Sequence, residues 1–241
     1  MQPKEEQIRT AMLLGTEAME KLKNARVAVF GVGGVGGHLC EALARVGVGA
    51  IDLFDNDTVS LSNINRQAVA LHSTVGMSKV EVMRERILDI NPDCRVGAYQ
   101  TFYLPQNADE FPLDGYDYIA DAIDTVSAKV ELAVRAAQAN VPIIAAMGAG
   151  NRTDPTKFTV TDLFLTEGCP LARVMRHELR ARGIHRLKVV FSTEPTAPRA
   201  ADAPEISADG DKKIPPASLP FVPSVAGLLM ARQITFDLIS K

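Results

Sequence analysis

The segment from residue 26 to residue 66 constrains the fold of this chain more than any other. An apolar β-branched run, Val27 to Phe30, is followed by the sequence GVGGVG, by a helical pattern over Leu39 to Val46 and by a second apolar run, Ala50 to Phe54, which ends in DND. Strand, glycine turn, helix, strand and acid, in this order, are the plan of a dinucleotide-binding fold. We therefore expect a Rossmann-like α/β fold with a mainly parallel sheet covered by helices on both faces.

The glycine cluster predicts a site for phosphate groups. Its glycines let the backbone turn tightly, and the N-terminus of the following helix directs unpaired N–H groups at an anion. Asp55, at the tip of the second strand, has the place from which a carboxylate accepts hydrogen bonds from ribose hydroxyls. The alternative is a glycine-rich packing turn without a ligand. The glycines concerned are Gly31, Gly33, Gly34 and Gly36.

Polar residues after the second strand indicate which nucleotide binds. Asn63 and Arg66 lie in the sequence SNINRQ, and Lys79 follows further along. A nicotinamide site needs a flat apolar pocket, whereas an arginine and a lysine beside a nucleotide suit the charge of a triphosphate. No GxxxxGK[ST] sequence is present, which excludes a P-loop protein. We predict ATP rather than NAD as the ligand.

Residues 1–241 are expected to form a single domain with a nucleotide-binding core at about 26–150. Later strands, among them Phe158 to Leu165, are predicted to extend one edge of the sheet in antiparallel fashion. Residues 194–220, rich in Pro, Ala, Asp and Ser, are predicted to form a long mobile loop. A final helix is expected over residues 224–239.

Composition excludes several classes of protein. The three cysteines are far apart and form no CxxC pair, so we expect neither a disulfide framework nor zinc.

The polar N-terminus is followed by no apolar signal-peptide core, and Arg232 and Asp237 interrupt the apolar final helix. We therefore expect a cytoplasmic protein whose final helix packs in the core or in a dimer, with no membrane partner. A net charge of −3 means that any RNA site must be a local patch.

Motifs along the chain resemble those of the ThiF/MoeB/HesA superfamily, the adenylating family that includes ubiquitin-activating enzymes and activators of sulfur-carrier proteins. These motifs are GVGGVG, DNDTV, SNINRQ, GMSK and DAID. The stretches RTAMLLG, EALARVGVG, INPDCRV, GAGNRTDP, CPLARVMR and VVFSTE are most similar to the tRNA threonylcarbamoyladenosine dehydratase branch. The resemblance covers roughly residues 8 to 194.

The resemblance implies ATP-dependent adenylation of a carboxylate, followed by cyclising dehydration of threonylcarbamoyladenosine in tRNA. The alternative activity is adenylation of the C-terminus of a ubiquitin-like sulfur carrier, in partnership with a sulfur-carrier or cysteine desulfurase system. Relatives of that kind usually carry two CxxC pairs for zinc, and some use a thioester cysteine. This chain lacks the CxxC pairs, and Cys169, where the dehydratase branch has Asp, lies in a different context from a thioester cysteine. We expect Cys169 to be a structural thiol, although a thiol that begins a helix can have a lowered pKa.

The resemblance also assigns site residues. Arg66 and Lys79 would meet the triphosphate, and Asp124 would hold Mg²⁺. Arg9, in a predicted helix over Glu5 to Leu22, would reach the phosphates of the partner subunit in a homodimer; the alternative is a solvated arginine. The complete ATP site that we expect consists of Gly31, Gly33, Gly34, Gly36, Asp55, Asp57, Asn63, Arg66, Lys79 and Asp124.

Three further assignments stay open at this point. Asp124 precedes a predicted helix, Ser127 to Ala139, and can serve as its N-cap. Lys129 is either a phosphate contact or an ordinary lysine on the helix surface. A row of arginines in the predicted helix Cys169 to Arg182 either binds tRNA phosphates or forms a solvated face. That row consists of Arg173, Arg176 and Arg180, which share one side of the helix.

Overall fold

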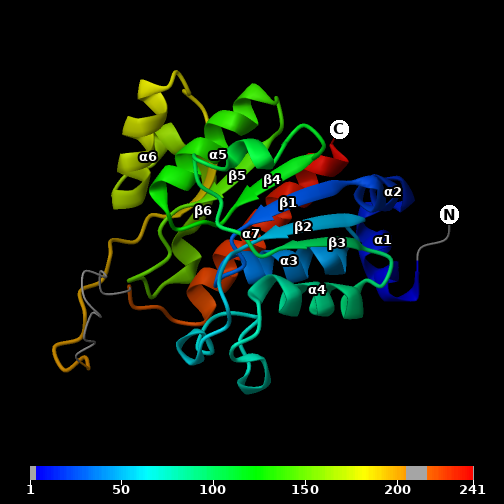
Figure 1. Cartoon of the computed structure of the whole chain (residues 1–241), viewed down its shortest axis with the longest axis horizontal. Coiled ribbons are helices and arrows are strands. Elements are labelled where there is room, and N and C mark those ends of the chain that lie inside the picture. The colour runs from blue at the N-terminus through cyan, green and yellow to red at the C-terminus, as the bar shows by residue number, and fades with distance from the viewer. Residues whose placement is uncertain (1–3, 205–215, 241) are drawn as a thin grey trace.

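The structure, a computed structural model, describes residues 4–204 and 216–240. Within these residues one sheet of seven strands has the order β3-β2-β1-β4-β5-β7-β6 (Figure 1). The strands are β1 (Arg26–Phe30), β2 (Ala50–Phe54), β3 (Arg95–Tyr99), β4 (Tyr118–Asp121), β5 (Ile143–Ala146), β6 (Phe158–Asp162) and β7 (Lys188–Ser192). Neighbouring strands are parallel except β6 and β7, which confirms a mainly parallel sheet with an antiparallel edge.

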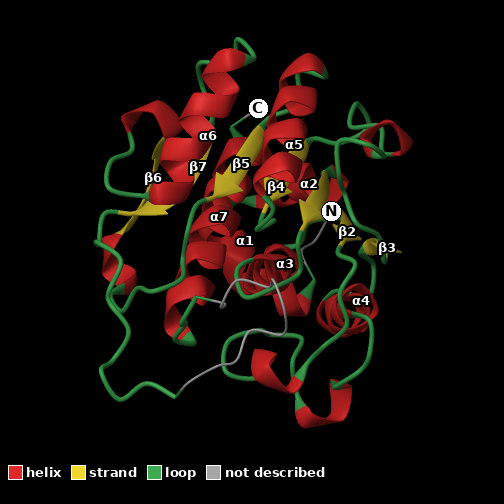
Figure 2. Ribbon diagram, turned by 60° about the vertical axis from the view of Figure 1, so that its left-hand side comes forward, coloured by secondary structure: helices red, strands yellow, loops and turns green. Residues whose placement is uncertain are grey.

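Helices cover both faces of the sheet, as the sequence predicts. Figures 1 and 2 show α3, α4 and α7 on one face and α5 and α6 on the other. Separate apolar clusters fill the two faces: Leu39, Met83 and Met230 lie in one, and Val130 and Met175 lie in another. The helices are α1 (Ile8–Leu14), α2 (Thr16–Asn24), α3 (Gly36–Val46), α4 (Lys79–Ile90), α5 (Val126–Gln138), α6 (Pro170–Ala181) and α7 (Phe221–Ile239).

Short 3₁₀ turns join these elements. They span Glu5–Gln7, Leu61–Asn63, His72–Thr74, Ala108–Glu110, Pro155–Lys157 and Leu163–Leu165. The last of them corrects the predicted strand Phe158 to Leu165. The side chain of Asp162 accepts a hydrogen bond from the N–H of Phe164 at 2.9 Å, so the strand ends there and a turn begins.

The order of the strands indicates where a ligand would bind. From β1 the chain passes to β2 and β3 on one side and then to β4 on the other, so the direction of winding changes between β1 and β4. Phe30 is the register partner of both Phe54 and Asp121, so the carboxyl ends of β1, β2 and β4 lie level. In open α/β sheets, ligands bind outside the carboxyl ends at such a switch point.

The N-terminal helix is broken, which corrects the single helix predicted over Glu5 to Leu22. Gly15 has φ 84° and ψ 163°, a combination open to glycine, and it separates α1 from α2. Both helices lie at the amino ends of the strands. The backbone of α2 accepts a hydrogen bond there, from Gly49 N–H to Leu22 at 3.0 Å, just before β2 begins.

The last helix belongs to the core. Among the described residues, α7 is the one helix with the length and apolar composition of a membrane span. It packs against α3 and α2 and against the sheet, which bears out a core role. Contact with α3 is close: a Cβ at Gly227 would lie 2.3 Å from the carbonyl oxygen of Val35. The helix begins at Phe221, three residues before the predicted start. Of the predicted loop 194–220, residues 205–215 lie outside the described part, and the remainder contains no helix or strand.

Candidate active site

The glycine loop between β1 and α3 is built for close backbone approach. Gly31 has φ 91°, and a Cβ there would lie 2.6 Å from the carbonyl oxygen of Ala122. A Cβ at Gly36 would lie 1.8 Å from the carbonyl oxygen of Gly31. A larger residue at Gly31 would therefore separate the loop from the turn after β4, and one at Gly36 would disrupt the loop itself. Gly33 and Gly34 lie on the outer side of the loop, where a Cβ would meet no backbone atom within 3.3 Å.

Asp55 connects the tip of β2 to this loop. Its Oδ2 accepts a hydrogen bond from the N–H of Val32 at 2.6 Å, and its Oδ1 accepts one from the N–H of Asp57 at 2.9 Å. Burial raises the pKa of Asp55, and these two hydrogen bonds and the nearby Lys79 ammonium partly offset the shift. The carboxylate thus lies where a ribose bound over the loop would present its hydroxyls.

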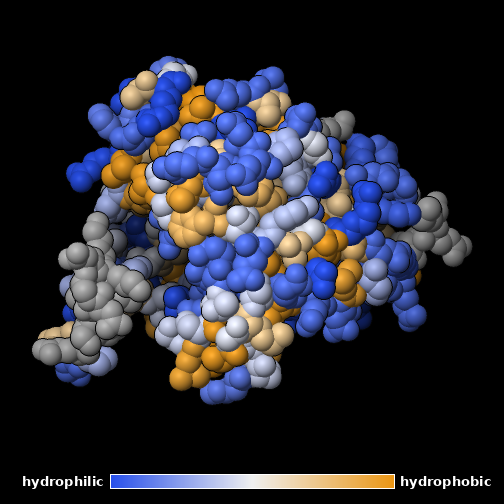
Figure 3. Space-filling view, in the orientation of Figure 1, coloured by the Kyte–Doolittle hydropathy of each residue, from blue (hydrophilic) through white to orange (hydrophobic). Residues whose placement is uncertain are grey.

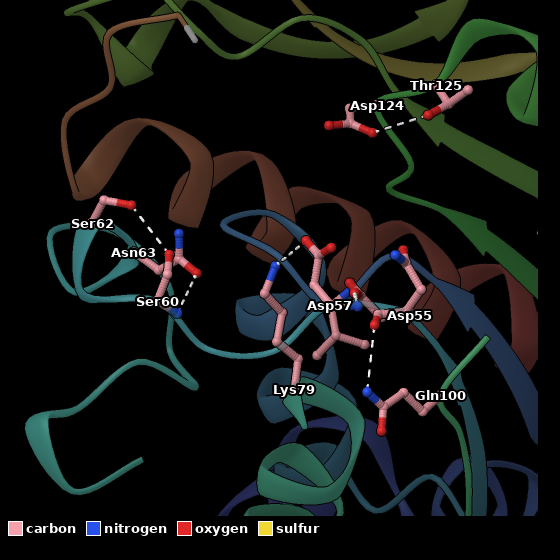
Figure 4. A network of polar contacts seen from close by, with 11 residues as sticks. Asp55, Asp57, Ser60, Ser62, Asn63, Lys79, Gln100, Asp124 and Thr125 are labelled. Atoms are coloured by element: carbon pink, nitrogen blue, oxygen red, sulfur yellow. Dashed lines mark hydrogen bonds and ion pairs between the residues drawn. The ribbon is translucent and has the colours of Figure 1, made fainter. Parts of the chain in front are cut away.

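Lys79 lies at the start of α4 and is only 5% exposed. Its ammonium forms an ion pair with the carboxylate of Asp57 at 2.7 Å, and Figure 4 shows the two side chains pointing toward one another. Its backbone N–H donates to the carbonyl oxygen of Asp57 at 3.1 Å. The buried ammonium therefore has one fixed position at the carboxyl edge of the sheet, available to phosphate oxygens once Asp57 releases it.

Asn63 and Arg66 come from the turn after β2. The Oδ1 of Asn63 accepts a hydrogen bond from the N–H of Ser60 at 3.2 Å, which orients the largely buried amide (Figure 4). Arg66 is partly exposed, and its guanidinium donates to two near neighbours, the carbonyl oxygen of Ser62 at 3.0 Å and the Oδ1 of Asn65 at 2.8 Å. Its Cγ lies 3.6 Å from the place of a Cβ on Gly34. The structure thus brings Arg66 to the rim of the glycine loop.

Asp124 lies in the turn between β4 and α5. The carboxylate is exposed and accepts a long hydrogen bond from the Thr125 hydroxyl at 3.4 Å (Figure 4). Thr125 is the N-cap of α5, so the alternative assignment of Asp124 as the cap is wrong. Ala122, two residues earlier, packs against Gly31 and donates its N–H to Phe30 at 2.8 Å. Asp124 therefore lies in a turn that packs on the glycine loop, and its carboxylate is exposed to solvent.

Lys129 corrects both predictions made for it. The side chain is fully buried, and its ammonium forms an ion pair with Asp121 at 2.9 Å. It is therefore neither a phosphate contact nor a lysine on the helix surface. Sequence reasoning missed Asp121, although a signal existed: a carboxylate at the end of a strand otherwise buried on both faces needs a buried partner.

Arg9 lies far from these groups. It is exposed on α1, at the amino edge of the sheet, whereas the glycine loop follows the carboxyl end of β1. The structure does not bring Arg9 together with the ATP-site residues of the same chain. A cavity of about 280 Å³ also lies at the amino edge, lined in part by Lys4, Gln7 and Asn91, and it is separate from the nucleotide residues.

The predicted arginine row is only partly free. Arg173 is exposed, whereas Arg176 donates to the carbonyl oxygen of Thr166 at 2.7 Å. Arg180 stacks over the ring of Phe164, 5.4 Å from its centre. Arg176 thus holds the turn before α6, which leaves Arg173 and Arg180 as the more accessible cations of the row.

The cysteines are buried free thiols. Cys40 and Cys94 lie in the core below the nucleotide site, and burial raises the pKa of Cys94 to about 11. Cys169 immediately precedes α6 and is 3% exposed. Its burial agrees with the structural role expected for it.

Comparisons with known proteins agree with this arrangement. The ThiF family matches residues 5–235 of the chain. The tRNA threonylcarbamoyladenosine dehydratase of Bacillus subtilis is 46% identical over 237 residues, which cover 96% of this chain and 93% of that protein. The protein of the same name from Escherichia coli is 40% identical over 221 residues, 87% of this chain and 82% of that one. A solved structure of E. coli tRNA N6-threonylcarbamoyladenosine dehydratase in complex with ATP is similar to this one, with a TM-score of 0.86, 35% identity and coverage of 98% of this chain and 94% of that one. The chain therefore belongs to the ThiF family.

Proposed function

We propose that this protein is an ATP-dependent tRNA threonylcarbamoyladenosine dehydratase. The observation that supports the proposal is that the glycine loop, Asp55 and the turn of Asp124 follow the carboxyl ends of β1, β2 and β4 at the switch point, with Lys79 and Arg66 nearby. The relative of this name from Bacillus subtilis is matched over 93% of its length, and the Escherichia coli protein solved with ATP over 94%.

In the first step, an oxygen of the threonyl carboxylate attacks the α-phosphorus of ATP. The bond from that phosphorus to the bridging oxygen of the β-phosphate breaks, pyrophosphate leaves and an acyl-adenylate forms. The protein need supply no covalent nucleophile; it positions the reactants and neutralises charge. Arg66 and Lys79 bind phosphate oxygens, Asp55 accepts from the ribose, and Asn63 orients a phosphate or the metal.

Asp124 fits a role in holding Mg²⁺ with ATP. No three His, Cys, Asp or Glu side chains gather into a metal site anywhere in residues 4–204 or 216–240. Mg²⁺ does not require such a group, since it commonly takes one or two carboxylates together with substrate phosphates and water. The exposed carboxylate of Asp124 beside the glycine loop matches that pattern. When bound, the ion spreads the negative charge of the phosphate oxygens.

In the second step, the carbamoyl group of the same nucleoside attacks the acyl carbon. A ring closes, the acyl–oxygen bond breaks and AMP leaves with the oxygen of the former carboxylate. The net change in the nucleoside is the loss of one water. Because the nucleophile belongs to the substrate, the reaction needs no thioester cysteine, in keeping with the burial of Cys169.

A second copy of the chain completes the proposed site. The protein is a cytoplasmic homodimer in which Arg9 of one subunit reaches the triphosphate of the other. Its place at the amino edge of its own sheet supports this arrangement, because it is far from its own glycine loop. Exposed apolar side chains on α1, namely Ile8, Met12 and Leu13, support a subunit contact there. Apolar side chains also gather at the bottom of the face shown in Figure 3. Leu61 and Leu71, from the segment between β2 and α4, are exposed as well.

The test uses tRNA that carries threonylcarbamoyladenosine. We expect the purified protein, with ATP and Mg²⁺, to convert this nucleoside to a product lighter by one water and to release AMP and pyrophosphate. Nucleoside mass spectrometry measures the product. The matched controls are tRNA without the threonylcarbamoyl group and a sulfur-carrier protein with a C-terminal Gly-Gly. Adenylation of the carrier without conversion of the tRNA would overturn the proposal in favour of the alternative.

A further inference from the structure

The ion pair between Asp121 and Lys129 is unusual in its burial. Both side chains are 0% exposed, and the ammonium of Lys129 lies 2.9 Å from the Oδ2 of Asp121. Removing two charges from water costs about as much as their attraction returns, so such a pair is a weak source of stability. Its consequence lies instead in the geometry that it fixes.

The pair fixes the turn that carries Asp124. The two oxygens of Asp121 have different partners: Oδ2 binds Lys129 of α5, and Oδ1 accepts the N–H of Ile123 at 3.1 Å. One carboxylate therefore connects the end of β4, the turn that follows it and the first part of α5. Asp124 is the next residue after Ile123.

The same turn lies against the glycine loop. The N–H of Ala122 donates to Phe30 at 2.8 Å, and the missing Cβ of Gly31 leaves room for the carbonyl group of Ala122. Among the described residues, the Asp124 carboxylate accepts one long hydrogen bond, from the neighbouring Thr125, so no other element fixes its side chain. The direction in which its carboxylate points depends on the backbone of the turn.

We propose that Asp121 and Lys129 are positioning residues that hold the Asp124 carboxylate at the glycine loop for Mg²⁺–ATP. The inference rests on the role of Asp124 given under the proposed function. Neither residue of the pair touches the nucleotide, because both are buried. Their effect therefore falls on the metal and not on the adenosine and phosphate contacts made by Asp55, Arg66 and Lys79.

The test replaces the pair without leaving a lone buried charge. In the full-length protein, Asp121→Leu with Lys129→Met removes both charges and the acceptor for Ile123. We expect the Mg²⁺ concentration required for half-maximal ATP–pyrophosphate exchange to rise by about tenfold or more, as for the loss of groups that orient a metal ligand. ATP affinity measured in the presence of EDTA should stay unchanged. Asp121→Asn with Lys129→Met, which removes both charges but keeps the size of the side chain and an acceptor for Ile123, is the second variant; it should fold and show a smaller rise.

A second ion pair provides the matched control. Lys188 and Asp237 form an ion pair at 2.5 Å near α7, away from the Asp124 turn. Lys188→Met with Asp237→Leu should change the melting temperature without changing the Mg²⁺ requirement. A folded Asp121/Lys129 variant with the wild-type Mg²⁺ requirement, or one that loses ATP affinity in EDTA as well, would overturn the inference. Asp124→Ala in the wild-type background separates the role of Asp124 from that of the ion pair. An unchanged Mg²⁺ requirement in this variant would refute the role of Asp124 itself.

Discussion

The carboxylate of Asp55 accepts a hydrogen bond of 2.6 Å from the backbone N–H of Val32, and this contact joins the tip of β2 to the glycine loop after β1. The same residue is the expected partner of the ribose. In the proposed ATP complex, one side chain would therefore both shape the glycine loop and accept from the ribose.

Replacing Asp55 should weaken nucleotide binding. We expect Asp55→Ala to reduce ATP affinity by about 10- to 100-fold, since hydrogen bonds to a charged group contribute about 1.5–3 kcal/mol each. Calorimetric titration with ATP in the presence of Mg²⁺ measures the change, and NAD should bind neither protein. Asp89→Ala, at an exposed acid of α4, is the control and should bind ATP normally. Tight binding of NAD without ATP would contradict the assignment.

Arg66→Ala should abolish adenylation while the fold stays intact. Its guanidinium contacts only the neighbouring Ser62 and Asn65, so its loss leaves no buried group without a partner. Because the arginine acts on charge that develops at phosphorus, the exchange rate should fall by about 10³-fold or more. ATP–pyrophosphate exchange and thermal unfolding are measured together, with Arg84→Ala on α4 as an exposed control. A near-normal exchange rate in the folded variant would reject this role.

Mixing two inactive variants should restore activity if subunits share their sites. Arg9→Ala removes the residue supplied in trans, and Arg66→Ala removes one supplied in cis. After subunit exchange, one of the two sites in a mixed dimer has both arginines, so exchange activity should return in part. Neither variant alone should recover on the same treatment. A monomeric mass by light scattering at working concentration would refute the arrangement.

Arg173 and Arg180 should contribute to tRNA binding through phosphates. Each contact releases counterions, so each arginine should add about one unit or less to the slope of log affinity against log salt. We expect Arg173→Ala with Arg180→Ala to bind tRNA more weakly and with a flatter salt dependence, and to bind ATP as before. Addition of Arg176→Ala should lower thermal stability as well, because Arg176 holds Thr166. Fluorescence anisotropy over a salt series measures both quantities. If the variant has the same tRNA affinity and the same salt slope as the parent protein, this side of α6 is only a solvated face.

Stability should fall in acid through Asp237. Burial disfavours its charged form, but hydrogen bonds from Lys188, Tyr118 and Gln233 outweigh burial and lower the pKa of Asp237. Its contribution is therefore present above the unfolded pKa of about 3.9 and is lost as the pH falls through the lower folded value. Wild type should melt well above Asp237→Asn at neutral pH, and the difference should shrink below about pH 4. Thermal unfolding over a pH series measures this; a difference independent of pH would contradict it.

The sequence predicts most of the fold because its signals are local. The apolar runs give the strands to within a few residues, and β2 begins and ends at the predicted residues. The break at Gly15 was missed because glycine is tolerated in helices, and only its positive φ marks the break. The early end of β6 depends on one side-chain hydrogen bond, from Phe164 N–H to Asp162, which competes with the strand.

The placement of the glycine loop, Asp55 and Asp124 at one edge of the sheet was also predictable, because they follow the carboxyl ends of β1, β2 and β4. The errors concern charged side chains whose partners lie on another element. Lys129 looks like a surface lysine in the pattern of its helix, yet it turns inward to Asp121. Arg176 shares a helical face with Arg173, yet it bonds to Thr166. Helical periodicity gives the direction of a side chain, but not the partner that packing offers to it.

The contact between α7 and the glycine loop joins two segments that are synthesised at different times. Pro223 lies 3.3 Å from the place of a Cβ on Gly34, and Gly227 packs on the backbone of Val35, so nearly the first and the last segments of the chain meet here. During translation the glycine loop leaves the ribosome early but lacks this support until the final helix has emerged. The apolar face of α3 stays uncovered for the same interval. A chain truncated before α7 should therefore be a better substrate for chaperones and proteases, and its glycine loop should lack this support until α7 has been synthesised.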